Sequence, residues 1–269
     1  MRGTSFSAGS GAAAAAAVGL ALVLAGCFAA APNERGDFGV TEVAEFVAND
    51  GAFCVSGIAY DDVGDQVWLL DYMGGVQRYA PDGAFLGTAV DSVDAWRALH
   101  PEAIAYTGAE QAVVVDADGA AFRMTMADGA LDPVPMDGRL GDSMTLDAAR
   151  GRLVATPAID FAATTADDGT PASTLVLLDA ASGAPAGQLI VGAPSVDSVS
   201  YAADLDTLVV LTNAGLLLLV DPDTGDTLAW GEGPGSAAKA IAYDASHGRI
   251  WSVNWALSYR VHAYQIDRH

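Results

Sequence analysis

Short strand-like segments in which small and large apolar residues alternate recur along this chain. The first large residue of each copy stands at position 58, 104, 144, 199 or 241, so the copies follow one another at intervals of 40 to 55 residues. This spacing is the length of one four-stranded blade of a β-propeller, and the longest interval predicts an insertion. The copies are Gly57-Ile58-Ala59-Tyr60-Asp61, Ala103-Ile104-Ala105-Tyr106, Ser143-Met144-Thr145-Leu146-Asp147, Ser198-Val199-Ser200-Tyr201 and Ala240-Ile241-Ala242-Tyr243-Asp244.

An apolar run follows each copy after a short turn and predicts a second strand that is buried on both faces. Turns that contain glycine follow, and they predict hairpins between third and fourth strands, because glycine adopts positive φ and Asp or Ser bonds its own backbone. The apolar runs are 67–70, 112–115, 153–155, 208–211 and 250–253, and the turns are 81–83, 127–129, 181–183 and 222–225.

The two ends of the repeat array are complementary. The last copy ends after its third strand, 260–266, whereas a spare strand-like stretch, 39–47, precedes the first copy. If the spare strand completes the last blade, the ring closes and no sheet edge is left open. We therefore predict an all-β, five-bladed β-propeller that is closed by its N-terminal strand, with six blades as the alternative.

The blade motifs resemble a known family. Residues 57–87 (GIAYDDVGDQVWLLDYMGGVQRYAPDGAFLG) are similar to a blade of the NHL and gluconolactonase-type propellers, and 221–228 (DPDTGDTL) resembles the hairpin turn of related repeats. The resemblance covers nearly all of the chain after the N-terminal segment, but its motifs specify a blade and not an activity.

Charge excludes one class of partner. The chain has 34 Asp and Glu against 12 Lys and Arg, a formal net charge of −22, and Lys239 is its only lysine. Binding to the phosphate backbone depends on clustered Lys and Arg, so we expect no nucleic-acid partner.

The N-terminus predicts export. Arg2 is followed by an uncharged stretch at 11–25 that is too short and too rich in alanine to span a bilayer comfortably. The stretch runs into Leu24-Ala25-Gly26-Cys27, which resembles the lipobox of bacterial lipoproteins. By this resemblance 1–26 is a signal peptide, Cys27 carries acyl chains such as palmitate and inserts them into a membrane, 27–37 is a tether and 38–269 is the propeller domain.

The same resemblance indicates the compartment. Phe28 is not the aspartate that retains lipoproteins in the inner membrane, so the outer membrane is favoured. The alternative is an ordinary signal peptide that is cleaved at 29–31 and leaves a soluble exported protein. With Cys27 acylated, Cys54 has no disulfide partner, and we predict that it is a small buried residue.

The repeat alignment places polar residues at one mouth of the axial channel. One ring of residues stands two positions before each first large residue, and a second ring comes directly after each second strand. The first ring is Ser56, Glu102, Asp142, Asp197 and Lys239, and the second is Asp71, Asp116, Pro157, Thr212 and Asn254. Because ligands meet propellers at such mouths, we predict a ligand-binding site made by Ser56, Asp71, Asp116, Lys239 and Asn254.

A metal site is the alternative for the acidic members of the ring. Converging carboxylates repel one another, and a hard cation such as calcium or magnesium would relieve that repulsion. The gluconolactonase-type propellers hold a divalent metal in this region, which by resemblance suggests Glu102, Asp142 and Asp197 as ligands, although the sequence around Glu102 differs from theirs. The structural alternatives are turn-forming side chains, solvated polar groups and an ion pair with Lys239.

Other segments carry weaker signals. The pattern of 91–100 predicts a short helix over the channel, and 160–172 predicts a polar loop. Trp68, Trp230, Trp251 and Trp255 are expected to pack between blades. The four histidines lack zinc-ligand spacing, and the sequence lacks both a GxSxG motif and a phosphate-binding glycine loop.

Together these observations favour a non-catalytic, membrane-anchored scaffold of the bacterial envelope that binds a protein or a small ligand at its channel face. The alternative is a divalent-metal-dependent hydrolase of the gluconolactonase type, acting on lactones or esters. A weaker third hypothesis is a component of an outer-membrane assembly.

Overall fold

The fold was analysed in a computed structural model. It describes residues 37–48, 54–73, 75–91, 98–136, 138–158, 164–165, 171–254 and 260–268. The chain divides into two compact units, Met1–Arg35 and Gly36–His269, and every described strand belongs to the second. No helix within the described residues has the length and hydropathy that a membrane crossing requires.

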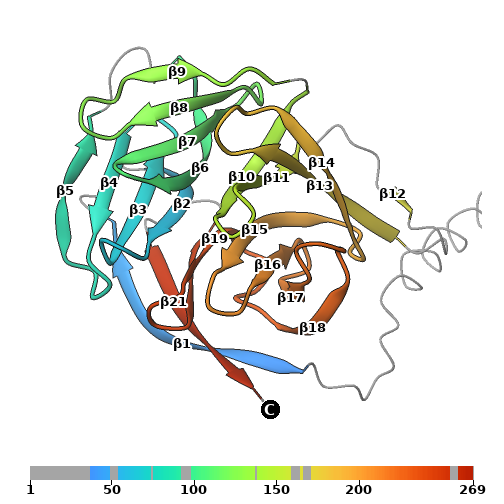
Figure 1. Cartoon of the computed structure of the whole chain (residues 1–269). Coiled ribbons are helices and arrows are strands. Elements are labelled where there is room, and N and C mark those ends of the chain that lie inside the picture. Colours follow the sequence, from blue (N-terminus) through green and yellow to red (C-terminus); the bar gives the residue numbers. More distant parts are fainter. Residues whose placement is uncertain are drawn as a thin grey trace, which may run out of the picture. The chain divides into compact units, whose positions relative to one another are not determined.

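The described strands are arranged as five consecutive groups of four, which makes the fold an all-β propeller (Figure 1). The first two groups are β2 (Val55–Asp61), β3 (Gln66–Asp71), β4 (Gly75–Tyr79) and β5 (Phe85–Val90), then β6 (Pro101–Gly108), β7 (Gln111–Asp116), β8 (Ala121–Thr125) and β9 (Leu131–Pro133). The third group is β10 (Leu140–Asp147), β11 (Arg152–Pro157), β13 (Pro171–Asp179) and β14 (Pro185–Val191), with the short β12 (Thr164–Thr165) paired to β13.

The last two groups are β15 (Val196–Ala202), β16 (Thr207–Thr212), β17 (Leu216–Val220) and β18 (Thr227–Glu232), then β19 (Ala238–Asp244), β20 (Arg249–Asn254), β21 (Arg260–Arg268) and β1 (Phe38–Val47). The inner strands β2, β6, β10, β15 and β19 contact one another in that order, and β19 contacts β2 again. The predicted copies lie on these inner strands, and the arrangement is compatible with the five blades that the repeat predicts.

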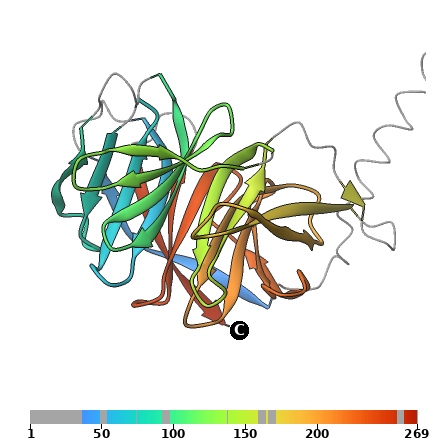
Figure 2. The ribbon, with the colours of Figure 1, turned by 45° about the horizontal axis from the view of Figure 1, so that its top comes forward.

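The N-terminal strand closes the ring, as predicted. β1 pairs antiparallel with β21 along its whole length, from Phe38 opposite Arg268 to Val47 opposite Arg260. Figure 2 shows the two strands side by side at this edge of the propeller. β1 also forms a parallel bridge to β18, which joins the last two blades into one eight-stranded sheet.

The small residues of the alternating pattern are required where inner strands converge. A Cβ atom on Gly57 would lie 3.2 Å from the backbone oxygen of Glu102 in the next blade. Elsewhere serine hydroxyls bridge the same gap: Ser198 Oγ accepts the Ile241 amide at 3.0 Å, and Ser200 Oγ accepts the Tyr243 amide at 2.8 Å. Small side chains therefore bring neighbouring backbones close, and hydroxyls connect them.

The large residues fill five apolar clusters among the described residues, and each cluster joins two neighbouring blades. Trp68 lies between the first and second blades and Trp251 between the fifth and first, both almost fully buried, and Trp230 packs against the cluster of the third and fourth. The predicted packing of these three tryptophans is confirmed, and Trp255 lies outside the described residues.

The prediction that Cys54 is buried is wrong, because its side chain is exposed. Cys54 stands just before β2, and only its backbone enters the blade: its amide donates to Asp71 Oδ1 at 3.2 Å, and its carbonyl accepts the Tyr72 amide at 2.9 Å. The predicted signal peptide, Cys27 and residues 28–36 of the predicted tether lie outside the described residues, as do 92–97 of the predicted helix and most of the 160–172 loop.

Candidate functional site

A register shift interrupts the pairing near the start of every inner strand, with one unpaired residue in four blades and residues 141–143 unpaired in the third. In the first blade Val55 pairs with Asp71 and Gly57 with Leu70, so that Ser56 is an extra residue without an opposite partner. Bulges of this kind disrupt the ladder locally and redirect a side chain, and they are common beside functional sites. The residues inserted at the five irregularities include every member of the predicted first ring: Ser56, Glu102, Asp142, Asp197 and Lys239.

Three of these side chains come together at the channel mouth. Lys239 Nζ lies 3.7 Å from Asp142 Oδ2, and the side chain of Lys239 is only 8% exposed against 22% for Asp142. Glu102 interacts with both of them and also with the charge of Asp116. The second, third and fifth blades thus contribute to one charged cluster.

Within this cluster, the pKa of Glu102 is shifted toward neutral pH. Burial raises the pKa of Glu102 to about 7, and a hydrogen bond and charge repulsion from Asp142 add to this effect, while Lys239 opposes it. A carboxyl group that titrates near neutral pH can both accept and donate a proton under ordinary conditions, which is what general acid–base chemistry requires.

Asp197 extends the acidic surface into the fourth blade. Its pKa is raised, chiefly by burial and secondarily by repulsion from Asp142. Asp142 thus acts on both Glu102 and Asp197, and Lys239 is the cation that acts on Glu102 and pairs with Asp142. The electrostatic field of such a mouth favours a positively charged ligand.

The other predicted site residues have structural partners. Ser56 is buried, and its hydroxyl donates to the Pro101 carbonyl at 2.7 Å, which ties the first blade to the second. Asp71 Oδ1 accepts the amides of Cys54 and Met73, with burial raising the pKa of Asp71.

Two more second-ring residues stabilise turns. Asp116 Oδ1 accepts the amides of Asp118 and Ala120, and Thr212 Oγ1 accepts the Leu216 amide. Asn254 stands opposite Ala238, one position before Lys239. The structural roles therefore match the turn-forming alternative for Asp71, Asp116 and Thr212.

The proposed metal ligands do not converge as a compact set. Across the described residues, one group of three places its ligand atoms within 4.8 Å of one another: Glu42, Glu45 and His262 of β1 and β21. Glu102, Asp142 and Asp197 form no such group. The mouth holds one of its carboxylates against Lys239 instead, which is the ion-pair alternative considered for the ring.

An aromatic pair at the same mouth was not predicted. His100 stacks on Tyr72 with ring centroids 4.8 Å apart, and these residues flank Pro101 and Asp71 at the strand ends. His100 has a φ of 49°, a left-handed conformation that is costly for a residue with a side chain. Its Nδ1 is buried without a hydrogen-bond partner among the described residues, and no local sequence signal distinguishes it.

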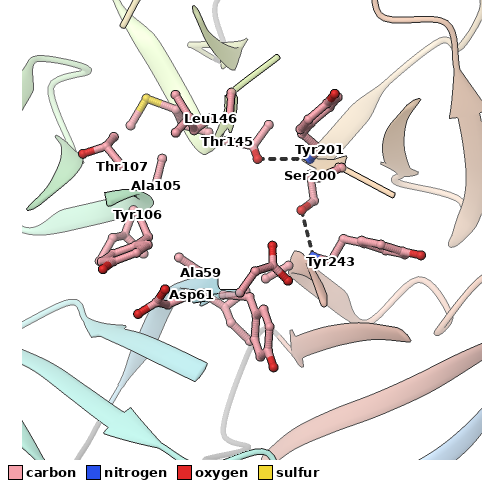
Figure 3. A pocket seen from close by; sticks show the side chains of 18 of the residues that line it. Ala59, Asp61, Ala105, Tyr106, Thr107, Thr145, Leu146, Ser200, Tyr201 and Tyr243 are labelled. Carbon is pink, nitrogen blue, oxygen red and sulfur yellow. Dashed lines mark hydrogen bonds between the residues drawn. The ribbon is translucent and has the colours of Figure 1, made fainter. Parts of the chain in front are cut away.

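A cavity of about 290 Å³ opens at the opposite end of the channel. Figure 3 shows it surrounded by the ends of the inner strands, where the tyrosines of the repeated motif lie. The sequence contained this signal, because tyrosine occupies the same position in four copies, but the prediction considered only the mouth at the strand starts. The tyrosines are Tyr60, Tyr106, Tyr201 and Tyr243, and Leu146 replaces them in the third copy.

Comparisons with known proteins bear on the fold. No family model and no curated protein matches the sequence. The structure is similar to the crystal structure of a glutaminyl cyclase from Myxococcus xanthus, with a TM-score of 0.62, 16% identity, and coverage of 87% of this chain and 99% of that one. It is also similar to a chain of a nidogen/laminin complex, with a TM-score of 0.53, 14% identity, and coverage of 81% and 84%. Both are β-propellers, and at these identities the likeness shows the fold alone.

Replacement of Lys239 tests the electrostatics of the mouth. Lys239→Met keeps the apolar stem but leaves the carboxylates without their cation, so we expect the variant to lose about 2 kcal/mol of stability near pH 8. The loss should shrink near pH 5, because Glu102 is protonated there and no longer needs a positive partner. Urea denaturation at both pH values measures the difference.

Arg123→Met provides the matched control, since the Arg123 guanidinium bonds the backbone carbonyls of Ala180 and Ala181. Its loss of stability should be the same at both pH values. An equal loss for Lys239→Met at both pH values would contradict the charged cluster described above.

Proposed function

We propose that this protein is a lipid-anchored protein of the bacterial envelope whose propeller binds a small amine-bearing ligand at the acidic channel mouth. The lipobox-like residues 24–27 support the anchor. The cluster of Glu102, Asp142 and Lys239, with Asp197 near Asp142, supports the ligand class.

The observation that carries the ligand proposal is the excess of partly desolvated carboxylates over cations at this mouth. Carboxylates removed from water are destabilised unless a positive charge or hydrogen-bond donors compensate them. Lys239 compensates part of this charge from the side of the fifth blade. A ligand ammonium group would supply a further positive charge and N–H donors, and would favour the ionised form of Glu102.

The anchor proposal rests on Cys27. Stable membrane attachment takes two lipid signals, because one acyl chain binds only reversibly. A lipobox cysteine carries more than one acyl chain by its resemblance to bacterial lipoproteins, and the tether to residue 37 would connect it to β1. The outer membrane is the proposed location, because Phe28 follows the cysteine.

Cys27→Ser should therefore abolish labelling of the protein by radioactive palmitate and move it from the membrane fraction to the soluble fraction. Cys54→Ser is the matched control, because Cys54 lies at the start of the first blade and should leave labelling unchanged. Labelling that survives in the Cys27→Ser variant, or an unaltered protein that is found in the soluble fraction, would refute the anchor.

A second candidate function is favoured by Glu102 together with the similarity to a glutaminyl cyclase. Cyclisation of an N-terminal glutaminyl residue forms a bond from its α-amine nitrogen to its side-chain carboxamide carbon and breaks the bond from that carbon to the amide nitrogen. Glu102 as a carboxylate would take the proton from the attacking amine. As an acid it would give that proton to the leaving nitrogen, which departs as ammonia.

Such a reaction would use the same acidic mouth. A pKa of about 7 lets Glu102 exchange protons in both directions, and the neighbouring carboxylates would hold the substrate's amino terminus. A gluconolactonase-type hydrolysis that needs calcium or magnesium is the remaining alternative. It would require a ligand set that the described residues of this mouth do not form within 4.8 Å.

Calorimetric titration with short peptides tests the proposed function. We expect dipeptides with a free amino terminus to bind and their N-acetylated analogues to bind at least about tenfold more weakly, as the loss of one charge-assisted contact predicts. Glu102→Gln should weaken the free peptides by a similar factor. Asp82→Asn, in an exposed hairpin turn of the first blade, should not.

The same experiment separates the functions. Ammonia released from a glutaminyl dipeptide, and lost in Glu102→Gln, would identify the enzyme, whereas binding without turnover would identify the binding protein. Hydrolysis of a lactone that depends on added calcium or magnesium would support the hydrolase. Equal binding of free and acetylated peptides would contradict the amine-binding proposal.

A further inference from the structure

We propose that the cavity at the opposite end of the channel is a second binding site, separate from the acidic mouth, for a compact alkylammonium cation such as a quaternary amine. The two sites lie at opposite ends of the inner strands. Glu102 and Lys239 belong to the strand starts, while the cavity is lined by residues of the strand ends, from Tyr60 to Val63 in the first blade and from Tyr106 to Gly108 in the second.

The wall of the cavity is preformed. Small side chains line it in every blade: Ala59, Ala105, Thr145, Ser200 and Ala242. Two of them are fixed by bonds across the blade contacts, because Thr145 Oγ1 accepts the Tyr201 amide at 3.0 Å and Ser200 Oγ accepts the Tyr243 amide at 2.8 Å (Figure 3). An apolar, preformed wall of this kind receives the body of a ligand with little reorganisation.

Aromatic rings surround this wall, and their hydroxyl groups already have partners. Tyr201 Oη donates to Asp206 at 2.7 Å, Tyr243 Oη donates to Asp204 at 3.3 Å, and Tyr60 bonds Asp65. Figure 3 shows the hydroxyls of Tyr201 and Tyr243 directed away from the centre of the opening. The phenol hydroxyls therefore leave the opening free, and the short side chains of the inner strands suit an apolar ligand body.

The charge of the cavity selects the ligand class. Asp61 and Asp62 line it, and the described lining residues include no Lys, Arg or His. Asp62 lies at the rim, where its side chain reaches solvent. Its Oδ1 accepts the Ala245 amide of the fifth blade at 2.9 Å. The cavity wall removes enough water to raise the pKa of Asp62, and the charges of Asp244 and Asp204 add to the rise.

The two carboxylates of the cavity have different roles. Asp61 is buried, and its Oδ1 accepts the amides of Val63 and Gly64, so it stabilises the turn. Asp62 is the carboxylate that can face a ligand. A carboxylate at the rim of a preformed apolar wall suits an alkylammonium ion, because the carboxylate can pair its charge while the wall contacts its alkyl groups. The volume of about 290 Å³ limits the ligand to a compact molecule.

Calorimetric titration with choline tests the site, with 3,3-dimethylbutan-1-ol as the neutral compound of the same shape. We expect choline to bind saturably in the cavity and the neutral compound to bind there at least about tenfold more weakly, because it lacks the charge that Asp62 recognises. Asp62→Asn keeps an oxygen for the Ala245 amide but removes the charge, so it should weaken choline binding by a similar factor.

A control variant makes the result specific. Asp82→Asn makes the same chemical change in a hairpin turn outside the cavity, so it should bind choline as the unaltered protein does. The proposal is overturned if choline shows no saturable binding up to about 10 mM, a concentration that would still reveal a weak site. Equal binding of the neutral compound, or choline binding that is unchanged in Asp62→Asn, would overturn it as well.

Discussion

The extra residue at the start of every inner strand is the constraint on which the rest of the site depends. Inner strands converge on the axis, so the paired positions must be small or apolar, as Gly57 shows by its contact with the backbone at Glu102. A bulged residue need not be small or apolar, because it has no opposite partner in the ladder. The ring can therefore vary freely in chemistry, from Ser56 to Glu102 to Lys239, while the strand around it stays constant.

This arrangement makes the mouth a place where charge is tolerated at low structural cost. The paired neighbours of the bulges bury apolar surface between blades, and three of the bulged residues, Glu102, Asp142 and Lys239, interact with one another. Lys239 is the only lysine in a chain with a formal net charge of −22, and it stands among the mouth carboxylates. Its position keeps the acidic cluster compatible with folding and leaves Glu102 able to titrate near neutral pH. A ligand that only binds would exchange no proton with Glu102. A substrate would need to place a transferable proton next to the Glu102 carboxyl group.

The repeat predicted most of the fold because each blade is defined by local pattern. The alternation around Ile58 and Ile241 located the inner strands, and the missing strand of the last copy predicted that β1 pairs with β21. Cys54 was misjudged, since its place before β2 depends on the blade edge and not on its own hydropathy.

The candidate site was predictable in position but not in detail. Counting back from each copy located all five bulged residues, yet the sequence could not show that Ser56 bonds across to the next blade while Glu102 turns toward Lys239. These outcomes depend on contacts between blades that are far apart in the chain. The cavity at the other end was missed because Tyr201 and its equivalents were used only to align the repeats. Their position at the strand ends was not considered as the wall of a cavity.

Glu102 is a desolvated carboxyl group that interacts with Asp142 and Lys239 at the channel mouth. The most direct test is a titration of its side-chain carboxyl carbon by NMR in the folded protein, assigned by comparison with Glu102→Gln. We expect a midpoint at a pH of about 7, a lower midpoint in Asp142→Asn and a higher one in Lys239→Met, since the first removes a repelling charge and the second an attracting one. A midpoint near the ordinary value of 4.5 that neither variant moves would contradict this account of the mouth.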